Sequence, residues 1–241
     1  MTDHALLSSE SHRDLRVRTD RGAALGDATM LAMLVPDEFR QAQNEYVILF
    51  RATPERDGFA AYALLGFENG ENLYLEGARW DARHRPLSID IQPFLIGRAA
   101  PDAEASQVHV DLASPRIARA DADEAIRVFD RDGRATPYLE RVAEQLGALD
   151  AGYQASAGFF DALRRYDLLE PLTLEVTLDD GATNRLVGFH VIDETKLQAL
   201  DGGVLGELHA AGHLMPIFMA LASLANLGAL IARKNRKQSG G

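Results

Sequence analysis

The order of apolar and polar residues predicts antiparallel strands in the C-terminal half of the chain. Apolar residues at 172, 174, 176 and 178 alternate with polar ones, which is typical of a strand with one buried face. Asp180-Gly181 then favours a tight turn, because both residues tolerate positive φ, and a returning strand follows at 185–192.

Apolar runs predict further strands nearer the N-terminus. They lie at 46–51, 58–66, 72–76, 87–91 and 108–112. Asn69-Gly70 separates the second of these from the third, so we expect a hairpin turn there. Residues 87, 89 and 91 are apolar and alternate with polar ones, which predicts a strand with one buried face.

Helical spacing of apolar residues predicts helices in the middle and at the end of the chain. Thr136-Pro137 favours a helix start, because the hydroxyl can cap free amides and proline loses no bond in the first turn. One helix is expected at 139–149 and a second at 159–166, and Asp193 can cap a third. The predicted class is α+β: an antiparallel-rich sheet with packed helices and a hydrophobic C-terminal helix.

The chain offers no long linker, so we expect one domain over 1–241. Within it we expect an N-terminal arm at 1–20, a C-terminal helix at 214–235 and a flexible tail at 236–241. No stretch near Met1 has the apolar core of a signal peptide, which predicts a cytoplasmic protein.

The last helix allows two interpretations. Residues 214–232 carry no charge and precede the basic side chains Arg233, Lys234, Arg236 and Lys237, as at the cytoplasmic end of a membrane span. However, Pro216, Ser223, Asn226 and Gly228 interrupt the apolar run, and much of the rest is alanine. We therefore favour a packed helix over a span. Ala225 and Gly228 provide a small surface on which another helix can pack, and Ser223 and Asn226 are candidate binding residues beside them.

Composition excludes several classes of protein. The chain has no cysteine, so disulfides, zinc–cysteine sites and iron–sulfur clusters are impossible. Its formal net charge of −11 disfavours nucleic acid as a partner, because phosphate is repelled. No nucleotide-binding glycine loop and no serine-hydrolase motif is present, and we expect no cofactor.

One pattern could bind a metal ion. His109 and Asp111 are two apart and share one face of a predicted strand, and a later histidine such as His190 could complete the ligand set of a non-haem iron oxygenase or hydrolase. A three-residue motif of this kind is common by chance, so this is the alternative interpretation. Arg79 and the single tryptophan, Trp80, are further binding candidates, because both residue types are enriched at binding hot spots.

Ten short segments carry a family resemblance. In chain order they are SHRDL at 11–15, VPDEF at 35–39, ALLGF at 63–67, GENLY at 70–74, Arg79-Trp80, QPF at 92–94, VFDRDG at 128–133, TPYL at 136–139, GFHVIDE at 188–194 and LASLANL at 221–227. Together they resemble the bacterial SapC-like family over most of the chain, from about Leu7 to Arg233. The chain departs from the expected pattern at Ala220, where we expect histidine, and at His109, where we expect cysteine.

The resemblance implies an accessory role and no established catalytic activity. Relatives often accompany TonB-dependent receptors, flavin-dependent halogenase-like proteins and cupin-like oxygenases. We therefore expect a non-catalytic adaptor or binding protein without catalytic residues. We expect it to associate with a protein partner or with itself, as a homo-oligomer, through the C-terminal helix.

Overall fold

The computed structural model describes residues 2–54, 58–98, 106–118, 122 and 124–239. The chain separates into two compact units. Unit 1 contains Met1–Ala28, Leu75–Trp80 and Leu87–Ala151, and unit 2 contains Thr29–Tyr74, Asp81–Pro86 and Gly152–Gly241. The units interleave along the sequence, so no linker marks the boundary between them. For this reason the absence of a long linker predicts a single domain.

Unit 1 consists of short antiparallel strands and the first part of a long helix. Its elements are β1 (His4–Leu6), β2 (Arg16–Val17), η1 (Ala23–Leu25), β6 (Leu75–Glu76), β7 (Arg79–Trp80), α2 (Leu87–Asp90), β8 (Phe94–Arg98), β9 (Ser106–Asp111), β10 (Ile117–Ala118), β11 (Ile126–Arg127) and α3 (Pro137–Arg165) as far as Ala151. The strands form three sheets, in the orders β1-β9-β8, β10-β2-β11 and β6-β7.

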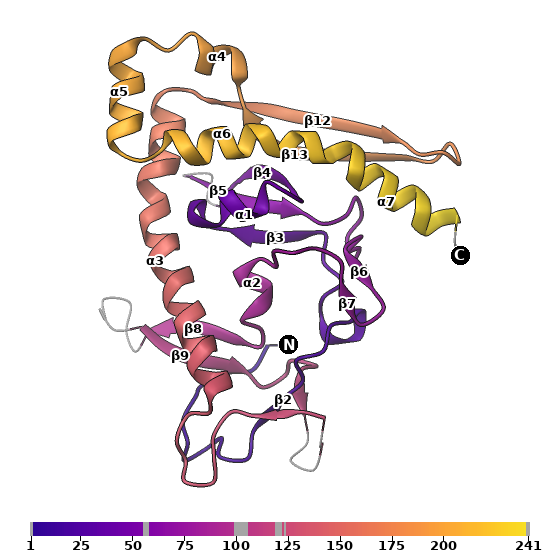
Figure 1. The fold of residues 1–241 in the computed structure, drawn as a ribbon, viewed down its shortest axis with the longest axis vertical. Coiled ribbons are helices and arrows are strands. Elements are labelled where there is room, and N and C mark those ends of the chain that lie inside the picture. The colour runs from indigo at the N-terminus through magenta and orange to yellow at the C-terminus, as the bar shows by residue number, and fades with distance from the viewer. Residues whose placement is uncertain (1, 55–57, 99–105, 119–121, 123, 240–241) are drawn as a thin grey trace. The chain divides into compact units, whose positions relative to one another are not determined.

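Unit 2 is built on a five-stranded antiparallel sheet in the order β12-β13-β4-β5-β3 (Figure 1). Its elements are β3 (Leu31–Leu34), η2 (Pro36–Glu38), α1 (Phe39–Ala42), β4 (Val47–Ala52), β5 (Phe59–Leu64), the rest of α3, β12 (Leu169–Thr177), β13 (Thr183–Ile192), α4 (Glu194–Gln198), α5 (Gly202–Ala210), α6 (Leu214–Ser223), η3 (Leu224–Asn226) and α7 (Leu227–Ser239). This confirms the predicted α+β class, with an antiparallel-rich sheet, packed helices and a hydrophobic C-terminal helix.

The core of unit 2 surrounds the central strand β4. Its residues 47–50 are all buried, so the strand is apolar on both faces rather than alternating. Phe159 on α3 contacts the rings of Phe39 and Phe50, with centroids 6.0 and 6.4 Å apart. Helices α1 and α6 also pack against β4. The central strand is thus enclosed by helices from distant parts of the sequence.

Several predicted elements are confirmed. The strands expected at 46–51, 58–66, 108–112, 172–178 and 185–192 correspond to β4, β5, β9, β12 and β13. The Oδ1 atom of Asp193 accepts a hydrogen bond from the Lys196 amide at 2.9 Å, which is the predicted cap of α4.

The strand predicted at 87–91 is wrong, because this segment forms the single helical turn α2. The Ile91 amide donates to the Leu87 carbonyl at 3.1 Å. Three alternating apolar residues are too few to distinguish a strand from one buried helical turn.

The hairpin predicted at Asn69-Gly70 is also wrong. Gly70 does adopt a positive φ of 78° in a turn. However, β5 is already paired with β4 on one side and β3 on the other, so it has no free edge for a returning strand. The strand after this turn, β6, pairs with β7 instead.

The two helices predicted at 139–149 and 159–166 are one continuous helix, α3. Gly152 does not end it. A Cβ atom at this position would lie 2.7 Å from Cγ2 of Val35, so glycine allows α3 to approach that residue closely. At the C-terminus, α7 extends to Ser239, so residues 236–239 of the predicted tail are helical, and 240–241 lie outside the described residues.

Candidate docking surface on the C-terminal helix

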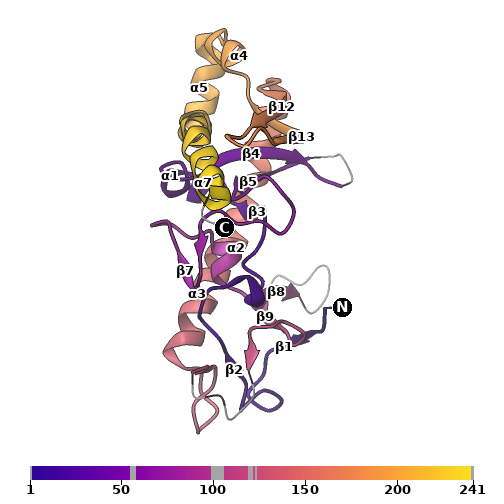
Figure 2. The same cartoon turned by 90° about the vertical axis from the view of Figure 1, so that its right-hand side faces the viewer.

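The C-terminal helix of unit 2 lies along one side of the five-stranded sheet. α6, η3 and α7 follow one another from Leu214 to Ser239, and Figure 2 shows them on one side of β4 and β13. α6 packs against both of these strands. Ile217 and Leu230 are fully buried on its inner face. Burying a side chain of this size contributes about 1.5–3 kcal/mol, so the helix is an integral part of unit 2.

Two polar side chains fix the middle of this helix to the sheet. The Ser223 hydroxyl donates to the Ala220 carbonyl at 2.6 Å and accepts from the Ile48 amide at 2.9 Å. The Asn226 amide nitrogen donates to the carbonyls of Gln43 and Tyr46, at 2.8 and 3.0 Å. Both predicted binding residues therefore face inward, where they satisfy buried backbone groups.

The basic end of the helix is held by acidic side chains of the same unit. Nζ of Lys234 lies 2.9 Å from Glu68 Oε1 and 2.7 Å from Glu71 Oε1. Burial acts to lower the pKa of Lys234, but the hydrogen bonds to Glu71 and Glu68 outweigh it and raise that pKa. The hydrogen bond from Lys234 lowers the pKa of Glu68.

Arg233 is engaged in a similar way. It pairs with the Asp81 carboxylate at 2.7 Å and with the Asp81 carbonyl at 3.0 Å. Its guanidinium carbon lies 4.5 Å from the centroid of the Tyr74 ring. Burial raises the pKa of Tyr74 to about 12, so this phenol stays neutral at neutral pH. Nζ of Lys237 also donates to the Asn72 carbonyl at 3.5 Å, so three of the four basic residues after the apolar run form contacts inside the protein.

The opposite side of the helix forms an exposed apolar face, which we call the outer face. Its exposed residues, with the basic one that follows them, are Met215, Phe218, Ala222, Ala225, Gly228, Ala229, Ala232 and Arg236. Met215 and Phe218 are 55% and 52% exposed. A Cβ atom at Gly228 would meet nothing within 4 Å, so this surface is open.

By length and composition alone, this helix could cross a membrane. Its most apolar window has a mean hydropathy of 2.0, and 22% of that window is buried. The helix is therefore packed on one side only, and it is less enclosed than our expectation of a packed helix implies.

A groove of about 410 Å³ adjoins the outer face near the start of α6. Its lining includes Asp37 and Arg40 from the η2–α1 segment, Phe159 from α3, and Met215 and Met219 from α6. The conformation of the η2 segment is set locally, because Pro36 begins the turn and Glu38 Oε2 accepts from the Val35 amide at 3.3 Å. The groove extends the apolar surface and adds one acidic and one basic group at its margin.

The other predicted binding residues, Arg79 and Trp80, belong to unit 1. Arg79 is exposed and pairs with Glu76 at 2.5 Å. Trp80 is only 8% exposed, so its ring covers part of the core. The structure therefore places these two in a different unit from Ala225 and Gly228.

The predicted metal ligands also belong to different units. His109 and Asp111 lie on β9 in unit 1, and His190 lies on β13 in unit 2. The Asp111 carboxylate accepts from the amides of Asp3 and Ala113, at 2.9 and 3.1 Å. Over the part of the chain that the structure describes, no three histidine, aspartate or glutamate side chains are grouped so as to hold a metal ion.

Both histidine rings pack against a neighbouring residue of the same unit. The His109 ring packs over Gly97, where a Cβ atom would lie 2.2 Å from Cδ2 of the ring. The His190 ring lies 5.0 Å from the ring of Phe59, and burial lowers its pKa. Nε2 of His109 and Nδ1 of His190 are buried and have no hydrogen-bond partner among the residues that the structure describes.

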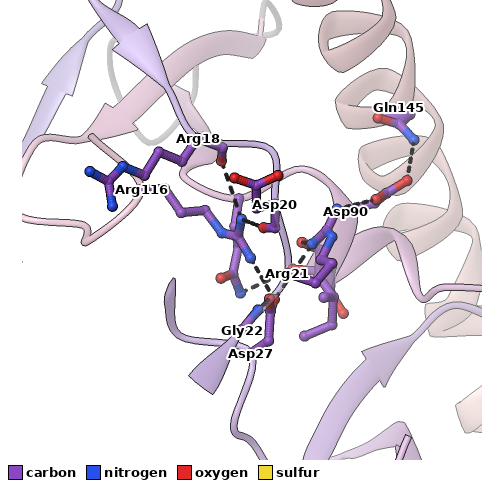
Figure 3. Close-up of polar contacts among 11 residues, drawn as sticks. Arg18, Asp20, Arg21, Gly22, Asp27, Asp90, Arg116 and Gln145 are labelled. Atoms are coloured by element: carbon purple, nitrogen blue, oxygen red, sulfur yellow. Dashed lines mark hydrogen bonds and ion pairs between the residues drawn. The ribbon is translucent and has the colours of Figure 1, made fainter. Parts of the chain in front are cut away.

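Unit 1 contains a buried ionic network that the sequence did not reveal (Figure 3). Arg116 and Asp27 are 1% and 0% exposed and pair at 2.5 Å. Arg21 joins Asp27 at 3.5 Å to Asp90 at 2.7 Å, and Gln145 on α3 donates to Asp90 at 3.0 Å. These residues are far apart in sequence, so no local pattern signals them. The network is charge-balanced and connects the 18–28 loop to α2 and α3.

Comparison with known proteins assigns the chain to a family. The family model described as SapC matches residues 7–230. No curated protein and no solved structure matches the chain. The match includes the η2 segment, both long strands of the β12–β13 hairpin, α6, and most of the outer face. The chain belongs to the SapC family.

Proposed function

We propose that this chain is a non-catalytic accessory protein that binds another protein chain through the outer face of α6–α7. The observation that supports this most directly is the exposure of Met215 and Phe218, each by more than half. Contiguous exposed apolar surface is typical of interaction sites, because its removal from water favours association. The adjoining groove enlarges the apolar area that a partner can cover.

The outer face is also held in a fixed conformation before binding. Ser223 and Asn226 attach the middle of the helix to the β4 region, and Lys234 attaches its end to Glu68 and Glu71. A surface that is already ordered loses little conformational entropy when it binds, so a larger share of the contact energy appears as affinity.

The polar contacts of the helix favour a protein partner over a lipid bilayer. Membrane insertion would separate Arg233 from Asp81 and Lys234 from Glu68 and Glu71. It would also expose the Ser223 and Asn226 hydrogen bonds to hydrocarbon, where unsatisfied polar groups are costly. The net charge of −11 further opposes binding to anionic lipid.

The proposal is tested by introducing large side chains on the outer face, where they would prevent a partner from packing closely. We expect the double variant Ala225→Leu and Gly228→Leu to lose its complex, because leucine at these positions holds an approaching chain away. Its fold should be unchanged, since both positions are exposed and nothing lies near the added Cβ of residue 228. Light scattering on purified protein gives the mass of the complex, and circular dichroism checks the fold.

A matched control uses the neighbouring helix α5. Gly206 and Ala210 are exposed there, and a Cβ atom at Gly206 also meets nothing within 4 Å. The double variant Gly206→Leu and Ala210→Leu should keep the complex. If the α6–α7 variant assembles as well as the wild type, the outer face is not the binding surface.

The partner is then identified from the mass of the complex isolated from the native host. TonB-dependent receptors and halogenase- or oxygenase-like enzymes are the protein classes that the family resemblance favours.

A further inference from the structure

We infer that the outer face is covered by the same helix of a second copy of this chain, packed antiparallel. This inference rests on the proposed function and names the partner. It follows from the spacing, the sizes and the charges of the side chains on the outer face, together with the acidic group beside it.

The spacing of the outer face is that of a helix–helix seam. Six residues repeat at intervals of four and three: Phe218, Ala222, Ala225, Ala229, Ala232 and Arg236. This 3.5-residue repeat keeps one stripe facing a partner helix along its whole length. All six are exposed, so the stripe is directed away from the sheet of its own unit.

The order of side-chain sizes favours antiparallel pairing with a second copy. In that arrangement Phe218 of one chain lies opposite Arg236 of the other. Ala222 lies opposite Ala232, and Ala225 lies opposite Ala229. Every position of the seam then has a partner, and the four alanines allow the two helices to approach closely. The guanidinium can pack over the phenyl ring, which is a favourable contact.

Parallel pairing is disfavoured by the same residues. It would place the two Phe218 rings side by side and bring the two Arg236 guanidinium groups together. The rings would hold the helices apart where the alanines need close approach. The like charges at the other end would repel. The sequence of the seam thus selects one direction.

Charge beside the seam agrees with the antiparallel arrangement. Asp37 is exposed and lines the groove next to Met215 and Met219 at the start of α6. At the other end of the helix, Lys237 is directed to the Asn72 carbonyl of its own unit, at 3.5 Å, whereas Arg236 is exposed on the outer face. A two-fold axis across the seam brings Arg236 of one copy opposite Phe218 of the other, at the end of the helix beside which Asp37 lies. The basic end of each helix therefore meets the acidic end of its partner.

The absence of cysteine from the chain gives a direct test of direction. Two variants are prepared, Ala222→Cys and Ala232→Cys, one of them carrying a removable tag. They are mixed under reducing conditions and then oxidised. In the antiparallel pair, position 222 faces 232, but two 222 positions are ten residues apart, or about 15 Å along the axis. A disulfide spans only about 4.4–6.8 Å between Cα atoms.

We therefore expect a mixed disulfide between the two variants and no disulfide when either variant is oxidised alone. Self-linked dimers of each variant, without the mixed species, would show parallel pairing and overturn the inference. A monomer whose native complex contains a different protein, lost in the Ala225→Leu and Gly228→Leu variant, would also overturn it while leaving the proposed function intact. A monomer that binds phosphatidylethanolamine–phosphatidylglycerol vesicles through this helix would overturn both.

A charge reversal gives an independent test with different outcomes for the two directions. We expect Arg236→Glu to weaken the dimer roughly two- to fivefold, because it removes the contact with Phe218 and adds an acidic group near Asp37 of the partner. In a parallel pair the same change replaces the repulsion of two guanidinium groups by that of two carboxylates and leaves the affinity unchanged, which would overturn the inference. Arg165→Glu, at an exposed position on α3, controls for the change in net charge.

Discussion

At the residue scale, Ser223 and Asn226 show how polar side chains attach an otherwise apolar helix. Each satisfies backbone groups near the start of β4, at Ile48 for Ser223 and at Gln43 and Tyr46 for Asn226. The residues on the opposite side of the helix form the outer face. The sequence identified 221–227 as a segment of the family resemblance that contains candidate binding residues. The direction of each side chain, however, depends on which face of the helix meets the sheet.

Replacing Asn226 should destabilise unit 2. We expect Asn226→Leu to lower the free energy of unfolding by about 1–3 kcal/mol, because two backbone carbonyls lose their donor. Urea denaturation measures the change. Asn235→Leu, at a half-buried position of the same helix, removes one hydrogen bond that Oδ1 accepts from the exposed Asp179 amide and should cost less than about 0.5 kcal/mol. Equal losses in the two variants would mean that Asn226 has no anchoring role.

Removing the central carboxylate of the ionic network should destabilise the protein more strongly. In Asp27→Asn the buried guanidinium of Arg116 loses its counter-ion, and we expect a loss of about 3–5 kcal/mol. Glu124→Gln is the control, because Glu124 and Arg18 form a pair with side chains 60% and 45% exposed, worth at most about 1 kcal/mol. A small effect of Asp27→Asn in chemical denaturation would show that Arg116 finds compensation elsewhere.

The Lys234 contacts predict a pH dependence with two limits. The pKa of Glu68 is lowered in the fold, so its contribution is present above its ordinary pKa of 4.5 and is lost as the pH falls through the lowered value. The pKa of Lys234 is raised, so its contribution is present below its ordinary pKa of 10.5 and is lost as the pH rises through the raised value.

The variant Lys234→Met removes both dependences. Denaturation of wild type and variant across pH should therefore give a constant stability difference between about pH 6 and pH 9, which shrinks toward either limit. A difference that stays constant below pH 4.5 would contradict the pairing with Glu68.

At the element scale, the sequence predicted where the strands lie better than it predicted which strands pair with one another. The alternation at 172–178 and the Asp180-Gly181 turn identified the β12–β13 hairpin, because its pairing is local. The pairing of β5 with β3 and β4 leaves no free edge, so the expected hairpin at Asn69-Gly70 could not form. Likewise, the packing of Val35 against Gly152 is a long-range contact, and it explains why a glycine lies within a continuous helix.

The candidate surface was predicted only in part, for a related reason. Small residues at 225 and 228 indicated a close-packing surface, and both are exposed. The exposure of Met215 and Phe218 depends on which residues of the helix the sheet covers. Periodicity gives the stripes of a helix but does not show which stripe faces the core.

The α6–α7 element should be essential for folding. We expect a chain that ends at residue 213 to lose cooperative unfolding, because Ile217 and Leu230 are fully buried and Ser223 satisfies a backbone amide of β4. Circular dichroism during urea titration reports this. A chain that ends at residue 237 should unfold as the wild type does. A stable, cooperative fold without α6–α7 would instead support a helix that serves only as a tether.

At the scale of the whole molecule, the two units differ in the feature that their charged groups support. Unit 1 contains the charge-balanced network around Arg116 and Asp27, and unit 2 carries the outer face with its ionic anchor at Lys234. Function is proposed for unit 2 because its exposed apolar residues lie on an element that is fixed by hydrogen bonds and ion pairs.

Native mass spectrometry of the untagged protein from its own host shows whether the outer face binds a second chain. We expect a species at twice the chain mass of 26.3 kDa, alone or with a further protein, that is absent in the Ala225→Leu and Gly228→Leu variant. A wild-type protein found only as a 26.3 kDa monomer at all concentrations, with no protein bound, would contradict it.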